Sequence, residues 1–269
     1  MPSLFNARDA ANYERLMGRW SRRLAPLFIE HAGIADGENI VEVGCGTGSL
    51  TFTLPRAADI ASLTAIDHSP IYLAAAQAKN QDPRIHLEHG DGSALRFADA
   101  SFDRAVSMLV LPSVLPRPDQ AVAEMRRVTR PGGVVCAAFW DSPGGAVASR
   151  MFWDTAAALD EAAAAARDRT MGRPIYAPDA LPRIWAEAGL VDIDLRSLTI
   201  RMDFTNFDDY WSPYASGEGM LGDYVASLDV ARRDRLEQYL RLAYLCGRPD
   251  GERSFVAVAL SCRGVVPRG

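Results

Sequence analysis

The chain has 269 residues, of which 48% are hydrophobic and 23% charged, a composition typical of a soluble globular protein with a large core. Its net charge of −5 argues against a dedicated nucleic-acid-binding protein, whose surface must be basic to bind phosphates. No apolar run approaches the ~20 residues that span a bilayer, and the first residues, MPSLFNARDAANYERL, carry charges where a secretory signal would be apolar. We therefore expect a cytoplasmic protein with no membrane span.

The four cysteines, Cys45, Cys136, Cys246 and Cys262, are scattered without CxxC spacing. This pattern favours neither a disulfide framework nor a zinc site, and it fits a reducing compartment. No cluster of metal-ligand residues stands out, so we expect no metal.

The first predicted element is a helix over residues 7–32. Leu16, Trp20 and Leu24 recur at helical spacing, with arginines on the other faces. Pro26 and Gly33 are expected to mark its end.

Strands and helices alternate over residues 39–140. The predicted strands are NIVEVG, SLTAID, RIHLEHGD, SFDRAVSMLVL and GVVCAAFW. A helix is expected after the glycine-rich loop that follows NIVEVG. One helix begins after Ser69, a plausible N-cap, with Pro70 in its first turn; another covers DQAVAEMRRVTRPGG and stops at its Pro-Gly-Gly. This alternation predicts a parallel sheet with helices on both faces, and ligands bind such sheets at the carboxyl ends of the strands.

The second half of the chain is less regular. We expect an alanine-rich helix over residues 147–169 that is broken by MGRP, and a short helix in DALPRIWAEAGL. VDIDLRSLTIRMDF alternates like a strand, residues 206–246 look helical, and RSFVAVALSCR is the last strand. There is no internal repeat or low-complexity linker, so a single domain over 1–269 with a helical insertion is expected.

The stretch VEVGCGTG carries the first functional signal. Its glycines permit positive φ angles and leave the backbone open to a ligand. A nicotinamide dinucleotide fingerprint would need G-x-G-x-x-G, but Ser49 stands where the third glycine belongs. Asp67 lies where a ribose-binding acid belongs, and it would serve equally in a dinucleotide site or in another adenosine-binding site. Tight packing at a strand-to-helix turn is the alternative that involves no ligand.

Four stretches in order, IVEVGCGTG, AID, GDGSALRF and SFDRAVSMLVLPSVLPRPDQAVAEMRRVTRPGGVV, resemble the motifs of class I S-adenosylmethionine-dependent methyltransferases. The likeness is to the small-molecule branch that includes the ubiquinone and menaquinone biosynthesis methyltransferases, and it covers about residues 38–141. YERLMGRWSRRLAP is similar to the cap helix of that branch. The resemblance implies a Rossmann-like, doubly wound, mostly parallel α/β sheet of seven strands with the last strand antiparallel.

The resemblance also implies a layout for the chain. Residues 1–36 would form amino-terminal cap helices, residues 37–141 the cofactor-binding core, and residues 142–269 a carboxyl-terminal half with a substrate-side helical insertion at about 205–247. The implied cofactor is S-adenosyl-L-methionine, with S-adenosyl-L-homocysteine as its product.

By the same resemblance the glycine loop lies under the methionine part of the cofactor, Asp67 accepts hydrogen bonds from the ribose hydroxyls, and Asp91 faces the adenine amino group. A carboxylate suits the ribose because it accepts two hydrogen bonds at once. Either acid could instead only cap the following helix. The implied cofactor-binding set is Tyr13, Arg19, Trp20, Glu42, Gly44, Cys45, Gly46, Gly48, Asp67, His68, Asp91, Gly92, Ser93, Met108 and Leu109.

Several members of this set have a plainer reading. Trp20 could only anchor its helix on the sheet, with Arg19 in solvent. Met108 could be core, Cys45 a small filler and His68 a solvated loop residue.

The acceptor is expected to be a small molecule methylated on oxygen or carbon. The tetrapeptide N-P-P-[YF] of nucleic-acid and protein-glutamine amino-methylating enzymes is missing after the fourth strand, where LVLPSV stands. Aromatic residues crowd the insertion, and Tyr210, Trp211 and Tyr214 are the predicted substrate-binding residues for a flat acceptor such as a quinone precursor or polyketide. They could instead bind the insertion to the sheet.

Other roles remain open from sequence. No side chain is identified as a catalytic base, and the protein is expected to be a monomer or a homodimer. A non-catalytic S-adenosylmethionine-binding protein is the main alternative, and a nicotinamide-dependent oxidoreductase is a weaker one.

Overall fold

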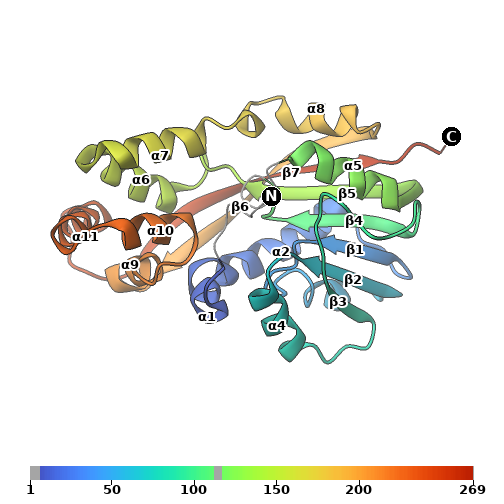
Figure 1. Ribbon diagram of the computed structural model, residues 1–269, viewed down its shortest axis with the longest axis horizontal. Coiled ribbons are helices and arrows are strands. Elements are labelled where there is room, and N and C mark those ends of the chain that lie inside the picture. Colours follow the sequence, from blue (N-terminus) through green and yellow to red (C-terminus); the bar gives the residue numbers. More distant parts are fainter. Residues whose placement is uncertain (1–6, 112–116, 269) are drawn as a thin grey trace.

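The structure, a computed structural model, describes residues 7–111 and 117–268. Its centre is a seven-stranded sheet in the order β3-β2-β1-β4-β5-β7-β6 (Figure 1). The strands are β1 (Asn39–Val43), β2 (Ser62–Asp67), β3 (Ile85–His89), β4 (Phe102–Met108), β5 (Thr129–Trp140), β6 (Val191–Phe204) and β7 (Arg253–Val265).

Strand direction confirms the predicted fold. β1, β2, β3, β4 and β5 pair in parallel, whereas β7 is antiparallel to both β5 and β6. β6 therefore runs in the same direction as the first five strands. The carboxyl ends of six strands consequently meet at one edge of the sheet, where α/β proteins bind ligands.

Alternating apolar residues let helices cover both faces of the sheet. Ile40 belongs to a core cluster that includes Phe28 of α2 (Arg19–Ala32), while Val41 and Val43 belong to a second cluster. The second cluster buries Met125 of α5 (Pro118–Val128) and Trp185 of α8 (Ala180–Glu187). The two layers fix the central strands between them.

The amino-terminal helix ends where it was predicted to end, but it is less regular than expected and Pro26 does not interrupt it. It runs through α1 (Ala10–Tyr13), a π-helical turn η1 (Glu14–Gly18) and α2, with Pro26 inside α2. Gly33 ends it in the left-handed conformation, as expected.

Three other expected boundaries were wrong. The glycine loop leads into a series of turns and the four-residue α3 (Leu54–Ala57), not into a regular helix. α5 ends at Val128 because Thr129 adopts an extended backbone and begins β5. The alanine-rich helix is two helices, α6 (Val147–Leu159) and α7 (Glu161–Met171), because Asp160 adopts an extended backbone and caps α7.

The chain between β6 and β7 forms the helical insertion predicted from the sequence. Its helices are α9 (Phe207–Ala215), α10 (Gly219–Ser227) and α11 (Val230–Leu245). α9 packs on α10 and α11, and α11 packs on α6, so these helices gather with α7 beyond one end of the sheet (Figure 1).

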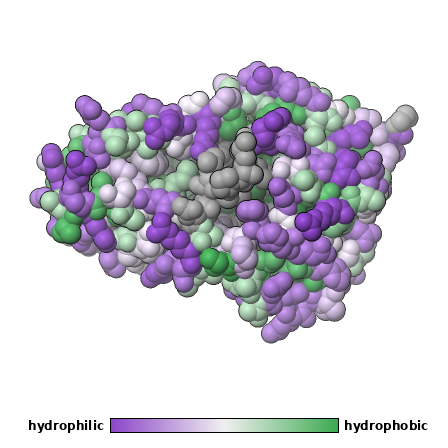
Figure 2. Space-filling model, in the orientation of Figure 1, coloured by the Kyte–Doolittle hydropathy of each residue, from purple (hydrophilic) through white to green (hydrophobic). Residues whose placement is uncertain are grey.

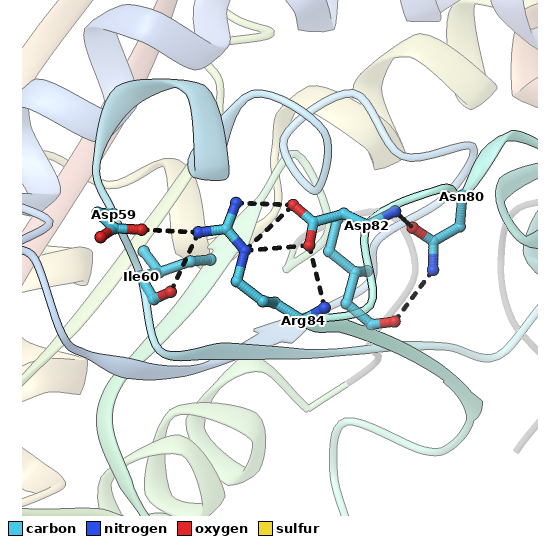
Figure 3. Close-up of polar contacts among 6 residues, drawn as sticks. Asp59, Ile60, Asn80, Asp82 and Arg84 are labelled. Carbon is cyan, nitrogen blue, oxygen red and sulfur yellow. Dashed lines mark hydrogen bonds and ion pairs between the residues drawn. The ribbon is translucent and has the colours of Figure 1, made fainter.

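A polar clamp joins β2 to the start of β3, beside α4 (Pro70–Lys79). Figure 3 shows the Arg84 guanidinium between Asp82, which it binds through Nε and Nη2, and Asp59, which lies 2.9 Å from Nη1. Arg84 holds the pKa of the Asp82 carboxyl at about 2. Asn80 completes the turn by accepting from the Asp82 amide and donating to the Ile85 carbonyl. The clamp holds the loop before β2 beside the start of the edge strand β3.

Figure 2 shows hydrophilic residues over most of the face in view, with apolar residues scattered among them. Within the part of the chain that the structure describes, no helix is long and apolar enough to cross a bilayer.

A buried ion pair fastens α2 to the sheet and yields a test of the fold. Arg104 of β4 binds both carboxylate oxygens of Glu38, at 2.7 and 2.6 Å, and also donates to the Ala32 carbonyl. We expect Glu38→Ala to lower the free energy of unfolding by about 3 kcal/mol, because it leaves a buried guanidinium without its counter-ion. Asp168→Ala, which breaks an exposed pair with Arg167, should cost less than about 1 kcal/mol. Equal losses in urea unfolding would contradict this assignment.

Candidate functional site

A cavity of about 580 Å³ opens at the carboxyl ends of the strands. One end is formed by the glycine loop, the tip of β2 and the start of α4, and the other by the helical insertion with α6 and α7. The amino-terminal helix lines the space between the two ends through Tyr13, Leu16 and Met17. One continuous cavity therefore has a polar loop end and an aromatic end.

The three loop glycines have different roles. All have positive φ, but a Cβ on Gly44 would collide with the Val110 methyls and one on Gly48 with the Phe52 ring. At Gly46 the nearest atom is the Tyr13 hydroxyl, 3.7 Å away. Gly44 and Gly46 line the cavity, whereas Gly48 does not. Packing thus accounts for Gly48, and Gly46 is the position where the backbone is left open.

Asp67 ties the loop to the tip of β2. Its carboxylate accepts from the Gly46 amide and from the Ser69 amide, both at 2.7 Å. Burial raises the pKa of this carboxyl, and the two amide hydrogen bonds oppose that rise. Each carboxylate oxygen still has a lone pair for a ligand in the cavity.

Glu42 lies behind the loop and not in the cavity wall. It is 2% exposed, and its Oε2 accepts a 2.7 Å hydrogen bond from the Thr51 hydroxyl. Burial raises its pKa to about 8, with a smaller contribution from the charge of Asp67. Cys45 is also buried outside the wall, and burial raises its thiol pKa well above the usual value.

The expected adenine end is only partly assembled from the predicted residues. Gly92 and His68 line the cavity, but Asp91 and Ser93 do not. Asp91 is exposed and its Oδ1 accepts from the amide and the hydroxyl of Ser93, which holds its pKa low. In this structure the Asp91 side chain therefore closes a local turn with Ser93, and it does not cap a helix, because β3 is followed by turns and then β4.

Two carboxylates hold the amino-terminal segment across the cavity. Glu218, fully buried, accepts from the amides of Arg8 and Asp9 and from the Tyr72 hydroxyl. Tyr72 in turn packs against Tyr13, with ring centroids 4.5 Å apart.

Glu14 is the second of these carboxylates. It accepts from the Thr47 hydroxyl at 2.6 Å and from Lys79 at 3.0 Å, and it pairs with Arg22. Burial alone would raise its pKa, but these hydrogen bonds lower it. The amino-terminal segment is thus bound to the insertion at one end and to the glycine loop at the other. Sequence patterns did not reveal either carboxylate.

The aromatic end contains two of the three predicted acceptor residues. Tyr210 and Tyr214, one helical turn apart on α9, line the cavity, whereas Trp211 points elsewhere and stacks on Phe207. The Tyr210 hydroxyl donates to the Ala148 carbonyl at 3.0 Å. Sequence reasoning missed the wall residues that other elements supply. The adjacent aromatic residues Phe152 and Trp153, in an otherwise alanine-rich helix, were a signal that could have indicated this part of the wall. The missed wall residues include Trp140, Ser142, Ser149, Trp153, Thr170, Met171 and Met202.

The remaining predicted residues also line the cavity. Met108 and Leu109 follow β4, and Leu109 has a φ of +67° with its amide bonded to the Ala138 carbonyl. Trp20 is 3% exposed and packs on Phe204 of β6, so it anchors α2 as well as lining the wall. Arg19 contacts Trp20 and Phe204, at the aromatic end. The LVLPSV segment falls partly on residues 112–116, outside the described residues.

Comparison with known proteins agrees with this geometry. A family profile described as "Methyltransferase domain" matches residues 41–137, the segment from the glycine loop to β5. Residues 41–137 belong to a class I S-adenosylmethionine-dependent methyltransferase domain. S-adenosylmethionine is the cofactor of this family.

Curated relatives of this methyltransferase domain include a demethylmenaquinone methyltransferase of Renibacterium salmoninarum, 36% identical over 135 residues, which are 50% of this chain and 54% of that protein. A malonyl-[acyl-carrier protein] O-methyltransferase of Erwinia pyrifoliae is 34% identical over 185 residues, 68% of this chain and 63% of that protein. The chain thus spans little more than half the length of these relatives.

A solved structure shares the fold of this chain. Phosphoethanolamine N-methyltransferase 2 of Haemonchus contortus, in complex with phosphomonomethylethanolamine and S-adenosylhomocysteine, superposes with a TM-score of 0.60 at 15% identity. The match covers 96% of this chain and 57% of that chain. At this identity the likeness concerns the fold alone.

The different roles of the methyltransferase glycines can be separated by substitution. We expect Gly44→Ala to lower the free energy of unfolding by about 3 kcal/mol or more, because the new methyl meets Val110 and φ is positive. Gly46→Ala should cost about 1–2 kcal/mol from its φ alone, yet weaken binding of S-adenosylhomocysteine at least tenfold. Urea unfolding and isothermal titration calorimetry measure the two effects. Unchanged ligand affinity in Gly46→Ala would show that nothing approaches the backbone there.

Glu42 predicts a pH dependence of the free energy of unfolding. A carboxyl whose pKa rises from 4.5 to about 8 on folding stabilises the protein fully below pH 4.5, and that stabilisation is lost as pH rises to about 8. Glu42→Gln should therefore remove a downward slope of at most about 1.4 kcal/mol per pH unit. Urea unfolding at about pH 5.5 and about pH 8 checks this for both proteins. If the difference between variant and wild type does not change with pH, Glu42 is already ionised in the folded protein.

Proposed function

We propose that this chain transfers a methyl group from S-adenosylmethionine to oxygen or carbon of a small aromatic acceptor. The observation that carries the proposal is the arrangement of Asp67, bonded to the Gly46 amide, at one end of a continuous cavity whose other end is aromatic. A small-molecule site is usually an apolar cavity with few polar groups of this kind.

The residues present fit the cofactor. Gly46 leaves the backbone open, so a ligand's amino-acid tail would rest against residues 44–46 of the main chain. The Asp67 carboxylate has the capacity to accept from both ribose hydroxyls. Gly90, Gly92 and His68 would border the adenine ring. Tyr13 and Tyr72 would close over the cofactor from the amino-terminal side.

Glu42, Cys45, Gly48, Asp91 and Ser93 would act indirectly in this proposal, through the shape of the loops. Glu42 supports the turn through Thr51, and Gly48 admits Phe52 behind the loop.

When bound, S-adenosylmethionine supplies a methyl group that is already activated as part of a sulfonium. The protein's contribution is to align the acceptor and exclude water, which can lower a barrier by several kcal/mol. Tyr210, Tyr214, Trp153 and Met171 supply an apolar wall for a flat acceptor. Met108 and Leu109, which also line the cavity, would flank the reacting atoms.

The relatives' names support the class of acceptor. One relative is named as a demethylmenaquinone methyltransferase and another as a malonyl-[acyl-carrier protein] O-methyltransferase. A third is named as a phosphatidylethanolamine N-methyltransferase, so the names support a metabolite as acceptor and do not select the acceptor atom. The aromatic residues that line one end of the cavity support the aromatic, quinone-like or polyketide-like case.

Asp67 and Asp91 provide the sharpest test of cofactor binding. Asp67→Asn should weaken S-adenosylhomocysteine binding about tenfold or more, because hydrogen bonds to a charged group contribute about 1.5–3 kcal/mol. Asp91→Asn should change it less, since Asp91 bonds Ser93 and lies outside the wall. Isothermal titration on both variants, with melting curves to confirm folding, makes the comparison. Equal effects of the two changes would contradict the role of Asp67.

Catalysis separates the proposal from its alternatives. A methyltransferase should transfer label from methyl-labelled S-adenosylmethionine to components of a metabolite extract. Binding of the cofactor without transfer would indicate a non-catalytic binding protein. Stabilisation by NAD(H) and not by S-adenosylhomocysteine would indicate an oxidoreductase.

A further inference from the structure

One charged side chain stands out at the aromatic end of the cavity. Among the described residues of the cavity wall, Arg19 is the sole lysine or arginine, and Asp67 is the sole carboxylate. Asp67 is held at the glycine loop, whereas Arg19 contacts β6 and α9 through Phe204 and Asp209. The cation therefore belongs to the end that we assign to the acceptor.

The guanidinium of Arg19 is fixed in place. Nη1 donates to Asp209 Oδ1 at 2.6 Å and Nη2 to the Asp209 carbonyl at 3.2 Å. Its carbon lies 4.3 Å from the centre of the Trp20 ring and 5.1 Å from that of Phe204. Asp209 is itself held by the Thr205 amide and does not line the cavity. A ligand in the cavity consequently meets the cationic partner of this ion pair.

Arg19 has unused hydrogen-bonding capacity. A guanidinium carries five N–H donors, and Asp209 accepts two of them. Nε is buried without a hydrogen-bond partner among the described residues. Each Nη retains one further N–H, and the side chain is 24% exposed. A charged group among aromatic rings with spare donors favours an anionic oxygen as its ligand.

The other polar groups at this end do not favour a cationic acceptor. Ser149, Thr170, Tyr210 and Tyr214 are the neighbouring polar residues of the described wall, and none is a carboxylate. Burial raises the pKa of both tyrosines, so they stay neutral at physiological pH. An ammonium group would meet Arg19 without a compensating anion from the described wall.

We infer that Arg19 is a specificity-determining residue, which selects aromatic acceptors that carry a carboxylate or another anionic oxygen group. The inference rests on the proposed function, since it concerns the acceptor end of the same cavity. Trp20, Phe204 and Tyr214 would contact the ring, and the guanidinium would bind the anion.

The test compares two probes of the same shape. 6-Hydroxy-2-naphthoic acid and 6-hydroxy-2-naphthamide are titrated calorimetrically into the full chain saturated with S-adenosylhomocysteine. In the wild type we expect the acid to bind at least tenfold more tightly than the amide. Arg19→Gln should abolish most of that preference, and Arg19→Lys should restore part of it.

A neighbouring arginine provides the matched control. Arg23 lies 5.4 Å from the same Trp20 ring but pairs with Asp203 and does not line the cavity. Arg23→Gln should therefore keep the preference for the acid. A preference lost equally in both variants would mean that the charge acts at long range, and the inference would fail.

Three further results would overturn the inference. They are equal affinities of the wild type for acid and amide, no binding of either probe, and a loss of S-adenosylhomocysteine affinity in Arg19→Gln. The last would assign Arg19 to the cofactor, as the family resemblance implies. The proposed function itself fails only if the wild type does not bind S-adenosylhomocysteine, which the same titration shows first.

Discussion

The site depends on one hydrogen bond, from the Gly46 amide to the Asp67 carboxylate. It joins the loop after β1 to the tip of β2. The amides of Gly44 and Cys45, which precede Gly46 in the loop, both donate to the Ile66 carbonyl. The carboxylate is buried, so its free energy depends on these donors, and the loop geometry depends on the carboxylate. Because Gly46 carries no side chain, this fixed loop presents bare backbone to the cavity.

The amino-terminal segment is hydrogen-bonded to the protein at both ends of the cavity. Glu14 binds the segment to Thr47 and Lys79 near the glycine loop, and Glu218 binds it to α10 in the insertion. Tyr72, from the helix after β2, shares Glu218 with the segment. The enclosed space is therefore built from three distant parts of the chain. Buried carboxylates with several donors suit this purpose, since losing any one donor is costly.

Much of the fold could be predicted from the sequence because its signals are local. β2 and β6 have the predicted bounds, and Ser69 and Pro70 begin α4 as expected. The errors have specific causes. Asp160 interrupts an alanine-rich helix because its own backbone is extended. The chain after Gly48 forms a series of turns instead of a helix, with the Phe52 ring packed against Gly48. The Asp160 carboxylate also accepts from the Tyr224 hydroxyl, a long-range contact that the local pattern does not show.

For the site, the sequence by itself determined the glycine loop, the acid at the end of β2 and the aromatic character of the insertion. These follow from residue type and spacing. Only the tertiary structure decided which of these residues meet: Tyr210 and Tyr214 enter the wall while Trp211 packs on Phe207, and Asp67 faces the loop while Asp91 bonds Ser93. It also decided that Arg19 lies among aromatic rings beside Asp209, 190 residues away along the chain. Side-chain direction and long-range contact depend on how helices pack on the sheet, and no local pattern encodes that packing.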